Sequence, residues 1–267
     1  MKFKFLKAAS ALLFALALGN ANAVIIPADI QITGQVTFAD GSNGSEPAEG
    51  NAVQTATMES IIGGVFSTST VDNTTVTGSN SRGGQLTDLL DGIGLDASLS
   101  STDIGSSDAF VFDYNFEIFN RSQTDDYIVS FAIEYDTRVN TGINAFVDNK
   151  LVLENPTEFF FSDLTSDTGF GGGDVKFDAG IFRFDIAVNA GEKKYFTGEI
   201  KLDGMSLSSG SSMSALNDSF ISVTAAQRTS NPPRPPTDVS EPSSVLLLLS
   251  GLFALGIKRR VAKKHSK

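Results

Sequence analysis

Apolar and polar residues alternate along several stretches of this chain, as they do in β-strands that bury one face. The clearest stretch is 110–118, where every second residue is Phe, Tyr or Ile and the positions between include Asp113 and Glu117. The stretch 127–136 repeats this pattern. A polar segment, 120–126, separates the two, so we predict an antiparallel hairpin with an aromatic inner face. The residues expected to be buried together in it are Phe110, Phe112, Phe116, Phe131 and Ile133.

A second predicted hairpin joins 181–188 to 195–202 through a turn at 189–193. Further strands are expected at 29–38, 61–71, 144–153, 175–177 and 219–225. Loops are expected at 40–50, 79–84, 162–174 and 206–214, with a short helix at 85–90. About nine or ten short strands without crossover helices predict an all-β fold, an antiparallel β-sandwich that forms an exported domain over 24–228.

The N-terminal segment 1–23 has the pattern of a secretory signal peptide. Three lysines precede an apolar segment at 8–19, and Ala21 and Ala23 form a small-x-small cleavage site. We therefore expect signal peptidase to cut after Ala23 and the mature chain to start at Val24. The alternative is an N-terminal membrane helix, for which the apolar segment is too short.

The C-terminal end has three consecutive parts. Four prolines in the linker 229–241 favour an extended spacer. The apolar run 245–257 follows, and a basic cluster ends the chain, which holds that end on the cytoplasmic side of a membrane. As a helix, the run is about 20 Å long at 1.5 Å per residue, whereas the hydrocarbon core is about 30 Å thick. A short membrane helix in the segment 242–267 therefore suits transient contact with the inner membrane.

The tail 239–267 resembles the PEP-CTERM sorting signal, which combines a Pro-Glu-Pro motif, a short apolar helix and a basic end. Here Ser240 occupies the position of the first proline, and Glu241 and Pro242 match the rest of the motif. The resemblance implies that an exosortase-type membrane protease cuts near Glu241 and Pro242 and delivers the protein to the cell surface or the extracellular matrix. The alternative is a membrane-anchored surface protein whose tail is never cut.

Charge separates the two ends from the body. The interval 24–241 holds 11 of the 20 basic residues and all 31 acidic residues, so its formal charge is −20, against −11 for the whole chain. A body this acidic repels nucleic acid and anionic lipid. We expect no nucleic-acid partner, and we name exopolysaccharide as a further candidate partner.

Composition also excludes several kinds of chemistry. The chain has no Cys, and its one His, His265, lies in the basic tail. Disulfides, thiol nucleophiles, His-ligated zinc and Ser-His-Asp triads are therefore excluded from the body. We expect no cofactor, no catalytic residue and no metal site. The alternative is calcium, for which two acidic clusters supply oxygen ligands, although Asp also stabilises turns without metal. The clusters are Asp163, Asp167 and Asp174, and Asp125 and Asp126.

These patterns predict an exported structural protein of the cell surface or extracellular matrix that is not an enzyme. The alternative is a secreted carboxylate-dependent enzyme that acts on polysaccharide, because two acids about 5 to 10 Å apart suffice to hydrolyse a glycoside. Such an enzyme should have a deep cleft with facing carboxylates. A structural module should have flat or convex sheets.

Overall fold

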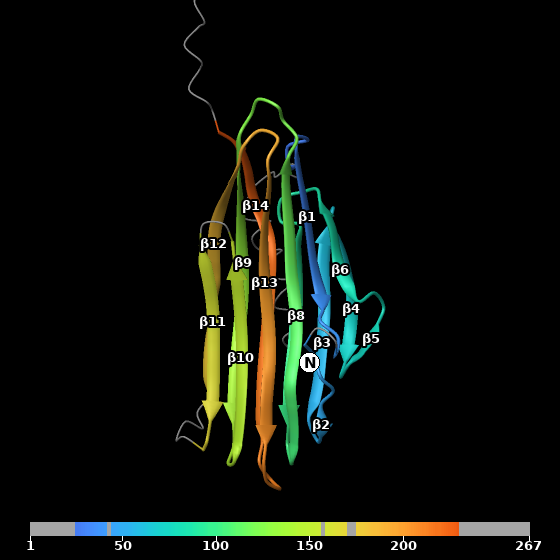
Figure 1. Cartoon of the computed structure of the whole chain (residues 1–267), viewed down its shortest axis with the longest axis vertical. Helices are drawn as coiled ribbons and strands as arrows, with labels where there is room; N and C mark the ends of the chain where they lie inside the picture. Colours follow the sequence, from blue (N-terminus) through green and yellow to red (C-terminus); the bar gives the residue numbers. More distant parts are fainter. Residues whose placement is uncertain (1–24, 42–43, 156–157, 170–174, 230–267) are drawn as a thin grey trace, which may run out of the picture. The chain divides into compact units, whose positions relative to one another are not determined.

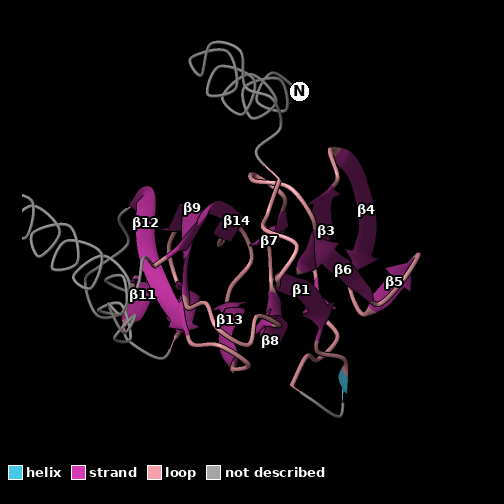
Figure 2. Cartoon of the chain, turned by 90° about the horizontal axis from the view of Figure 1, so that it is seen from above, coloured by secondary structure: helices cyan, strands magenta, loops and turns pink. Residues whose placement is uncertain are grey.

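The computed structural model describes residues 25–41, 44–155, 158–169 and 175–229, and these form two antiparallel β-sheets packed face to face (Figure 1, Figure 2). The described ranges contain fourteen strands and no α-helix. Within them, no helix has the length and apolar character needed to cross a membrane. Contacts divide the chain into Met1–Thr229 and Ser230–Lys267, and every described residue lies in the first unit.

Each sheet has seven strands. In spatial order, the first sheet contains β11 (Phe159–Asp167), β10 (Ala145–Glu154), β13 (Lys193–Ser206), β8 (Gly105–Asn120), β1 (Ile30–Phe38) and β6 (Ser81–Leu86), with β2 (Glu49–Gly50) paired to the start of β8. The second sheet contains β12 (Lys176–Val188), β9 (Tyr127–Thr141), β14 (Met213–Arg228), β7 (Gly92–Ser101), β3 (Val53–Ile62), β4 (Val65–Asp72) and β5 (Thr75–Thr77). Both sheets are antiparallel, as the alternation predicted.

The core is aromatic where the middle of the two sheets meets. Phe116 of β8 stacks on Phe196 of β13, with 4.4 Å between ring centroids. Phe131 of β9 comes from the opposite sheet and meets both rings edge-on, at 6.0 Å and 4.9 Å. The predicted register is confirmed, because the five residues expected to be buried together are each at most 2% exposed: Phe110, Phe112, Phe116, Phe131 and Ile133.

Both predicted hairpins are wrong, because each turn carries the chain from one sheet to the other. β8 pairs with β13 and β1 in the first sheet, whereas β9 pairs with β12 and β14 in the second. The turn that follows β12 likewise leads to β13 in the other sheet. Alternation specifies which side of a strand is buried. The same pattern arises when two consecutive strands pair in one sheet and when they lie in opposite sheets with their apolar faces toward each other, so alternation alone does not identify a hairpin.

Other predicted boundaries also change. The expected strand 61–71 is interrupted at Gly63 and Gly64, whose φ angles of 57° and 73° form the turn between β3 and β4. The expected loop 79–84 and helix 85–90 are largely replaced by β6 and the turn that follows it. β11 occupies the start of the expected loop 162–174. The strands β2, β5 and β7 were not expected either, so the described strands outnumber the nine or ten expected.

Polar side chains join the sheets beside the aromatic core. The Tyr114 hydroxyl of β8 donates to the Ser219 carbonyl of β14 at 3.2 Å, and burial raises the pKa of Tyr114, which keeps this donor protonated. The Asn217 amide nitrogen of β14 donates to Asn149 Oδ1 of β10 at 2.8 Å. Two hydroxyl pairs, Thr137 with Ser162 and Thr141 with Ser166, link β9 to β11. These bonds satisfy polar groups that would be costly to bury alone.

The two ends of the described chain meet at the segment 120–126. The Arg121 amide donates to the carbonyl of Asp29, just before β1, at 2.7 Å. The Thr229 amide, just after β14, donates to the Asp126 carbonyl at 2.9 Å. The chain therefore enters and leaves the sandwich at the same end.

Candidate functional site

The outer face of the first sheet carries carboxylates in facing pairs. Asp113 of β8 lies directly opposite Glu199 of β13, and Asp148 of β10 lies opposite Asp203 of β13. We call these four residues the carboxylate ladder. Between its two pairs lies a row of two lysines, Lys150 and Lys201. Like charges directly opposite each other on neighbouring strands are unfavourable.

The lysines offset part of this repulsion. Lys150 Nζ lies 3.5 Å from Glu199 Oε1, and Lys201 Nζ lies 3.3 Å from Asp203 Oδ1. Both pairs are partly exposed, so each contributes little to stability. The ladder thus keeps an excess of negative charge on this face.

Two members of the ladder hold their protons more tightly than usual. Burial, assisted by the neighbouring Glu199, raises the pKa of Asp113. Burial also raises the pKa of Asp203; Lys201 opposes this effect, and Asp148 and Asp108 reinforce it more weakly. A carboxylic acid with a raised pKa is the feature that a general acid needs.

Asp113→Asn should stabilise the protein at neutral pH. Because the pKa of Asp113 is raised in the folded state, its carboxylate lowers stability progressively once the pH exceeds the unfolded value, about 3.9. At pH 7 the variant should gain about 0.2–1 kcal/mol in free energy of unfolding, the range for cross-strand pairs. Urea unfolding at pH 7 and pH 3 measures this, and the gain should vanish at pH 3. Asp163→Asn is the control, because Asp163 lies opposite Lys150 and should show no gain. An equal gain in both variants would contradict the interpretation.

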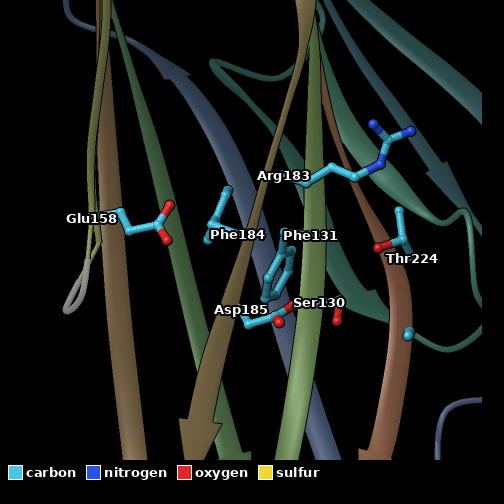
Figure 3. Close-up of a pocket in the computed structure, with 8 residues that line it drawn as sticks. Ser130, Phe131, Glu158, Arg183, Phe184, Asp185 and Thr224 are labelled. Carbon is cyan, nitrogen blue, oxygen red and sulfur yellow. The ribbon is translucent and has the colours of Figure 1, made fainter.

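An open pocket of about 400 Å³ lies elsewhere, where β9, β12, β14 and the residue before β11 approach one another (Figure 3). Its polar lining includes Ser130, Arg183, Asp185, Thr224 and Glu158. At Thr224 the pairing of β14 with β9 shifts register, as in a β-bulge, and such irregularities re-aim side chains.

Two acids line the pocket, Asp185 of β12 and Glu158 just before β11, and they come from separate segments (Figure 3). A carboxylate-dependent glycosidase needs one carboxyl group with a raised pKa beside the bound sugar. Asp113 and Asp203, whose pKa values are raised by burial, belong to the carboxylate ladder on the first sheet and do not line this pocket. The pocket is therefore separate from Asp113 and Asp203.

The sequence-predicted processing residues lie outside the described residues. They are Ala21, Ala23, Glu241 and Pro242. The predicted signal peptide, most of the linker and the membrane helix also lie outside.

The first calcium candidate is occupied by protein contacts. Asp125 forms an ion pair with Arg228 at the end of β14. Asp126 Oδ1 accepts a hydrogen bond from the Ala190 amide at 2.8 Å. These two carboxylates therefore connect the turn 120–126 to the end of β14 and to the turn that follows β12.

The second calcium candidate is spread along β11. Asp163 and Asp167 are four residues apart in this strand, about 13 Å at 3.3 Å per residue, which is too far for one ion to bind both. Asp167 Oδ1 accepts a hydrogen bond from the Gly169 amide at 2.7 Å, and Asp174 lies outside the described residues. Among the described residues, no three acidic or His side chains are grouped to hold a metal ion.

The carboxylate ladder was missed by the sequence reasoning. Alternation placed Asp113 on an outward face, but Glu199 belongs to a strand far along the chain. Only the pairing of β8 with β13 brings the two together. The sequence does show acidic residues at outward positions of several predicted strands. It does not show which of these residues lie opposite each other.

No protein-family model matches the chain, and no curated protein matches it. Among solved structures, the chain is similar to that of the infectious bursal disease virus Gx strain, with a TM-score of 0.17 and 12% identity over 80% of this chain. It is also similar to the VP2 subviral particle of the same virus, with a TM-score of 0.13 and 9% identity over 75% of this chain and 67% of that one. The chain spans 60% of the first of these structures. Similarities at these TM-scores carry no argument about function.

Proposed function

We propose that this chain is an exported structural protein of the cell surface or extracellular matrix, delivered by a PEP-CTERM-like tail. The observation that carries the proposal is the order of motifs in that tail. Glu241 and Pro242 follow an extended linker and precede the short apolar run 245–257 and a basic end. The signal-like segment 1–23 agrees with export, because a signal peptide at the N-terminus directs a chain across the inner membrane, which a sorting tail at the C-terminus also requires.

The described body suits this role. Its interior is filled by apolar side chains and by the polar bonds that join the sheets. Because the chain enters and leaves the sandwich at one end, beside the segment 120–126, a linker leaves from that end alone.

The enzyme alternative has weaker support. Its two requirements are a substrate pocket and a carboxylic acid with a raised pKa. The pocket of Figure 3 is lined by Glu158 and Asp185, whereas Asp113 and Asp203, the described acids with a raised pKa, lie away from it in the carboxylate ladder. A structural role requires neither feature.

Replacing Glu241-Pro242 by Ala-Ala should leave an uncut precursor in the inner membrane. The parent should be recovered at the cell surface or in the medium, starting at Val24 and ending near Glu241. The reason is that a short helix holds the chain in the bilayer only until a protease acts at the motif. Mass spectrometry of both ends, with cell fractionation, measures the result.

Pro235-Pro236→Ala-Ala is the matched control, because it makes the same kind of change in the linker outside the motif. This variant should be processed like the parent. If the parent itself stays in the membrane with Lys267 attached, and the Glu241-Pro242 variant behaves identically, the tail is a permanent anchor and the sorting proposal fails.

A further inference from the structure

β12 is the long unpaired edge of the sandwich. It ends the second sheet, pairs with β9 on one side, and has no strand partner on its other side among the described residues (Figure 2). Its outward face exposes Phe177, at 74%, and Ile181, at 46%. A long edge with exposed apolar side chains is a template for pairing with another strand.

The other edges are less suited to pairing. β5, at the far end of the same sheet, has three residues. β6, at one end of the first sheet, contains Gly83 and Gly84 with φ angles of 152° and 156°, which no other residue type adopts readily. β11, at the other end, carries Asp163 at its centre, so two copies paired there about their centres would place two carboxylates opposite each other.

The outward charges of β12 are complementary to themselves. Arg183 and Asp185 are two residues apart on the outward face, on either side of Phe184. Arg183 makes no ion pair with any described residue. If two β12 strands pair antiparallel about Phe184, each Arg183 lies opposite Asp185 of the partner subunit. In the same register each Ile181 lies opposite Ala187 of the partner subunit, an apolar pair.

Neighbouring registers are less favourable. Pairing about Arg183 places the two arginines opposite each other, and pairing about Phe182 places Arg183 opposite Ile181 of the partner subunit. Displacing the register by an odd number of residues would place inward aromatic side chains opposite outward charged ones, which the buried face of the sheet excludes. Pairing about Phe184 also continues the inner face, since partly buried Phe182 meets Ile186 of the partner subunit.

We propose that two copies of this chain associate through β12, antiparallel about Phe184, so that their second sheets become one continuous sheet. The occupant of this edge is a second copy because the charge pattern is complementary to itself under two-fold symmetry. Backbone hydrogen bonds along the edge supply affinity, and the reciprocal Arg183–Asp185 pairs fix the register. The inference stands whether or not the chain is exported.

Cysteine cross-linking tests the register directly, because the chain has no cysteine of its own. The variants Ile181→Cys and Ala187→Cys change exposed side chains. When the two purified full-length variants are mixed in mild detergent and oxidised, they should form a disulfide-linked dimer on a non-reducing gel. Each variant alone should not, because like positions are then about 20 Å apart, at 3.3 Å per residue, and a disulfide requires Cα atoms within about 7 Å.

A charge exchange tests the ion pairs. Arg183→Asp alone and Asp185→Arg alone should each raise the dimer dissociation constant about tenfold or more, because each places like charges in opposition. The double variant should recover dimerisation, since it restores both pairs with the signs exchanged. Arg121→Asp, which lies outside β12, should have no effect on sedimentation. Failure of the mixed cysteine variants to cross-link, equal cross-linking by a single variant, or no recovery in the double variant would overturn the proposal.

Discussion

Replacing Phe116 by alanine should lower the free energy of unfolding by about 3–5 kcal/mol, the range for removing a buried Phe. Phe116 is 2% exposed, stacks on Phe196 and meets Phe131 from the opposite sheet. Its loss removes contacts on both sides of the core and leaves a cavity that two packed sheets cannot close. Equilibrium unfolding in urea, with circular dichroism as the probe, measures the change.

Phe161→Ala is the control for this prediction. Phe161 lies in the same sheet, on the edge strand β11, and is 61% exposed. Its replacement should change the free energy of unfolding by no more than about 0.5 kcal/mol, as surface substitutions usually do. Equal losses for Phe116→Ala and Phe161→Ala would mean that the aromatic core is not where the two sheets are held together.

The second large effect is expected at Gly34 of β1, which makes room for the Phe116 ring. A Cβ at this position would lie 2.5 Å from Phe116 Cε1 and 3.0 Å from Ile93 Cγ1. Both neighbours are buried and tightly packed. Gly34→Ala should therefore cost about 1–3 kcal/mol, the usual cost of overpacking a core. The same unfolding experiment measures it.

The cause can be separated from a general loss of packing by combining the two changes. In the Phe116→Ala background the ring is gone, so Gly34→Ala should cost little, and the two effects should be clearly non-additive. Gly41→Ala is the control, because nothing lies within 4 Å of a Cβ at Gly41 and its φ is not positive. If the costs of Gly34→Ala and Phe116→Ala simply add, the ring is not what excludes a side chain at position 34.

Alternation predicted where strands lie better than it predicted their partners. The strands expected at 29–38 and 144–153 match β1 and β10 within one residue at each end. The faces of β8 and β9 were also predicted, because an inward aromatic every second residue leaves one register possible. The partners were wrong because sheet membership depends on contacts between strands that are distant in sequence.

Among the strands missed in the second sheet, β3 and β7 were missed for different reasons. β3 presents Gln54, Ala56, Met58 and Ser60 to the interior, so it has little apolar alternation to detect. β7 does alternate, with Ile93, Leu95, Ala97 and Leu99 inside, but Gly92 and Gly94 weaken the pattern, because glycine is depleted in strands. These glycines lie against the Phe220 ring on the outer face, where a Cβ would approach the ring to 2.5 Å. Their role is to admit that ring.

The candidate site was less predictable than the fold. The raised pKa of Asp113 depends on burial and on Glu199, and both follow from a pairing that alternation does not specify. The signal peptide, the linker and the sorting tail stay predictions, because their motifs lie outside the described residues.

The order of strands in the second sheet also bears on how the chain matures. β14, the last strand in the sequence, lies in the middle of this sheet, between β9 and β7. Until residue 228 has left the ribosome, those two strands lack their shared partner, and their open edges cannot be satisfied by any nearer segment. Without β14, the second sheet would be divided into β12 with β9 on one side and β7, β3, β4 and β5 on the other. We therefore expect the sandwich to be completed only after its last strand is available, whether the chain folds during synthesis or after export.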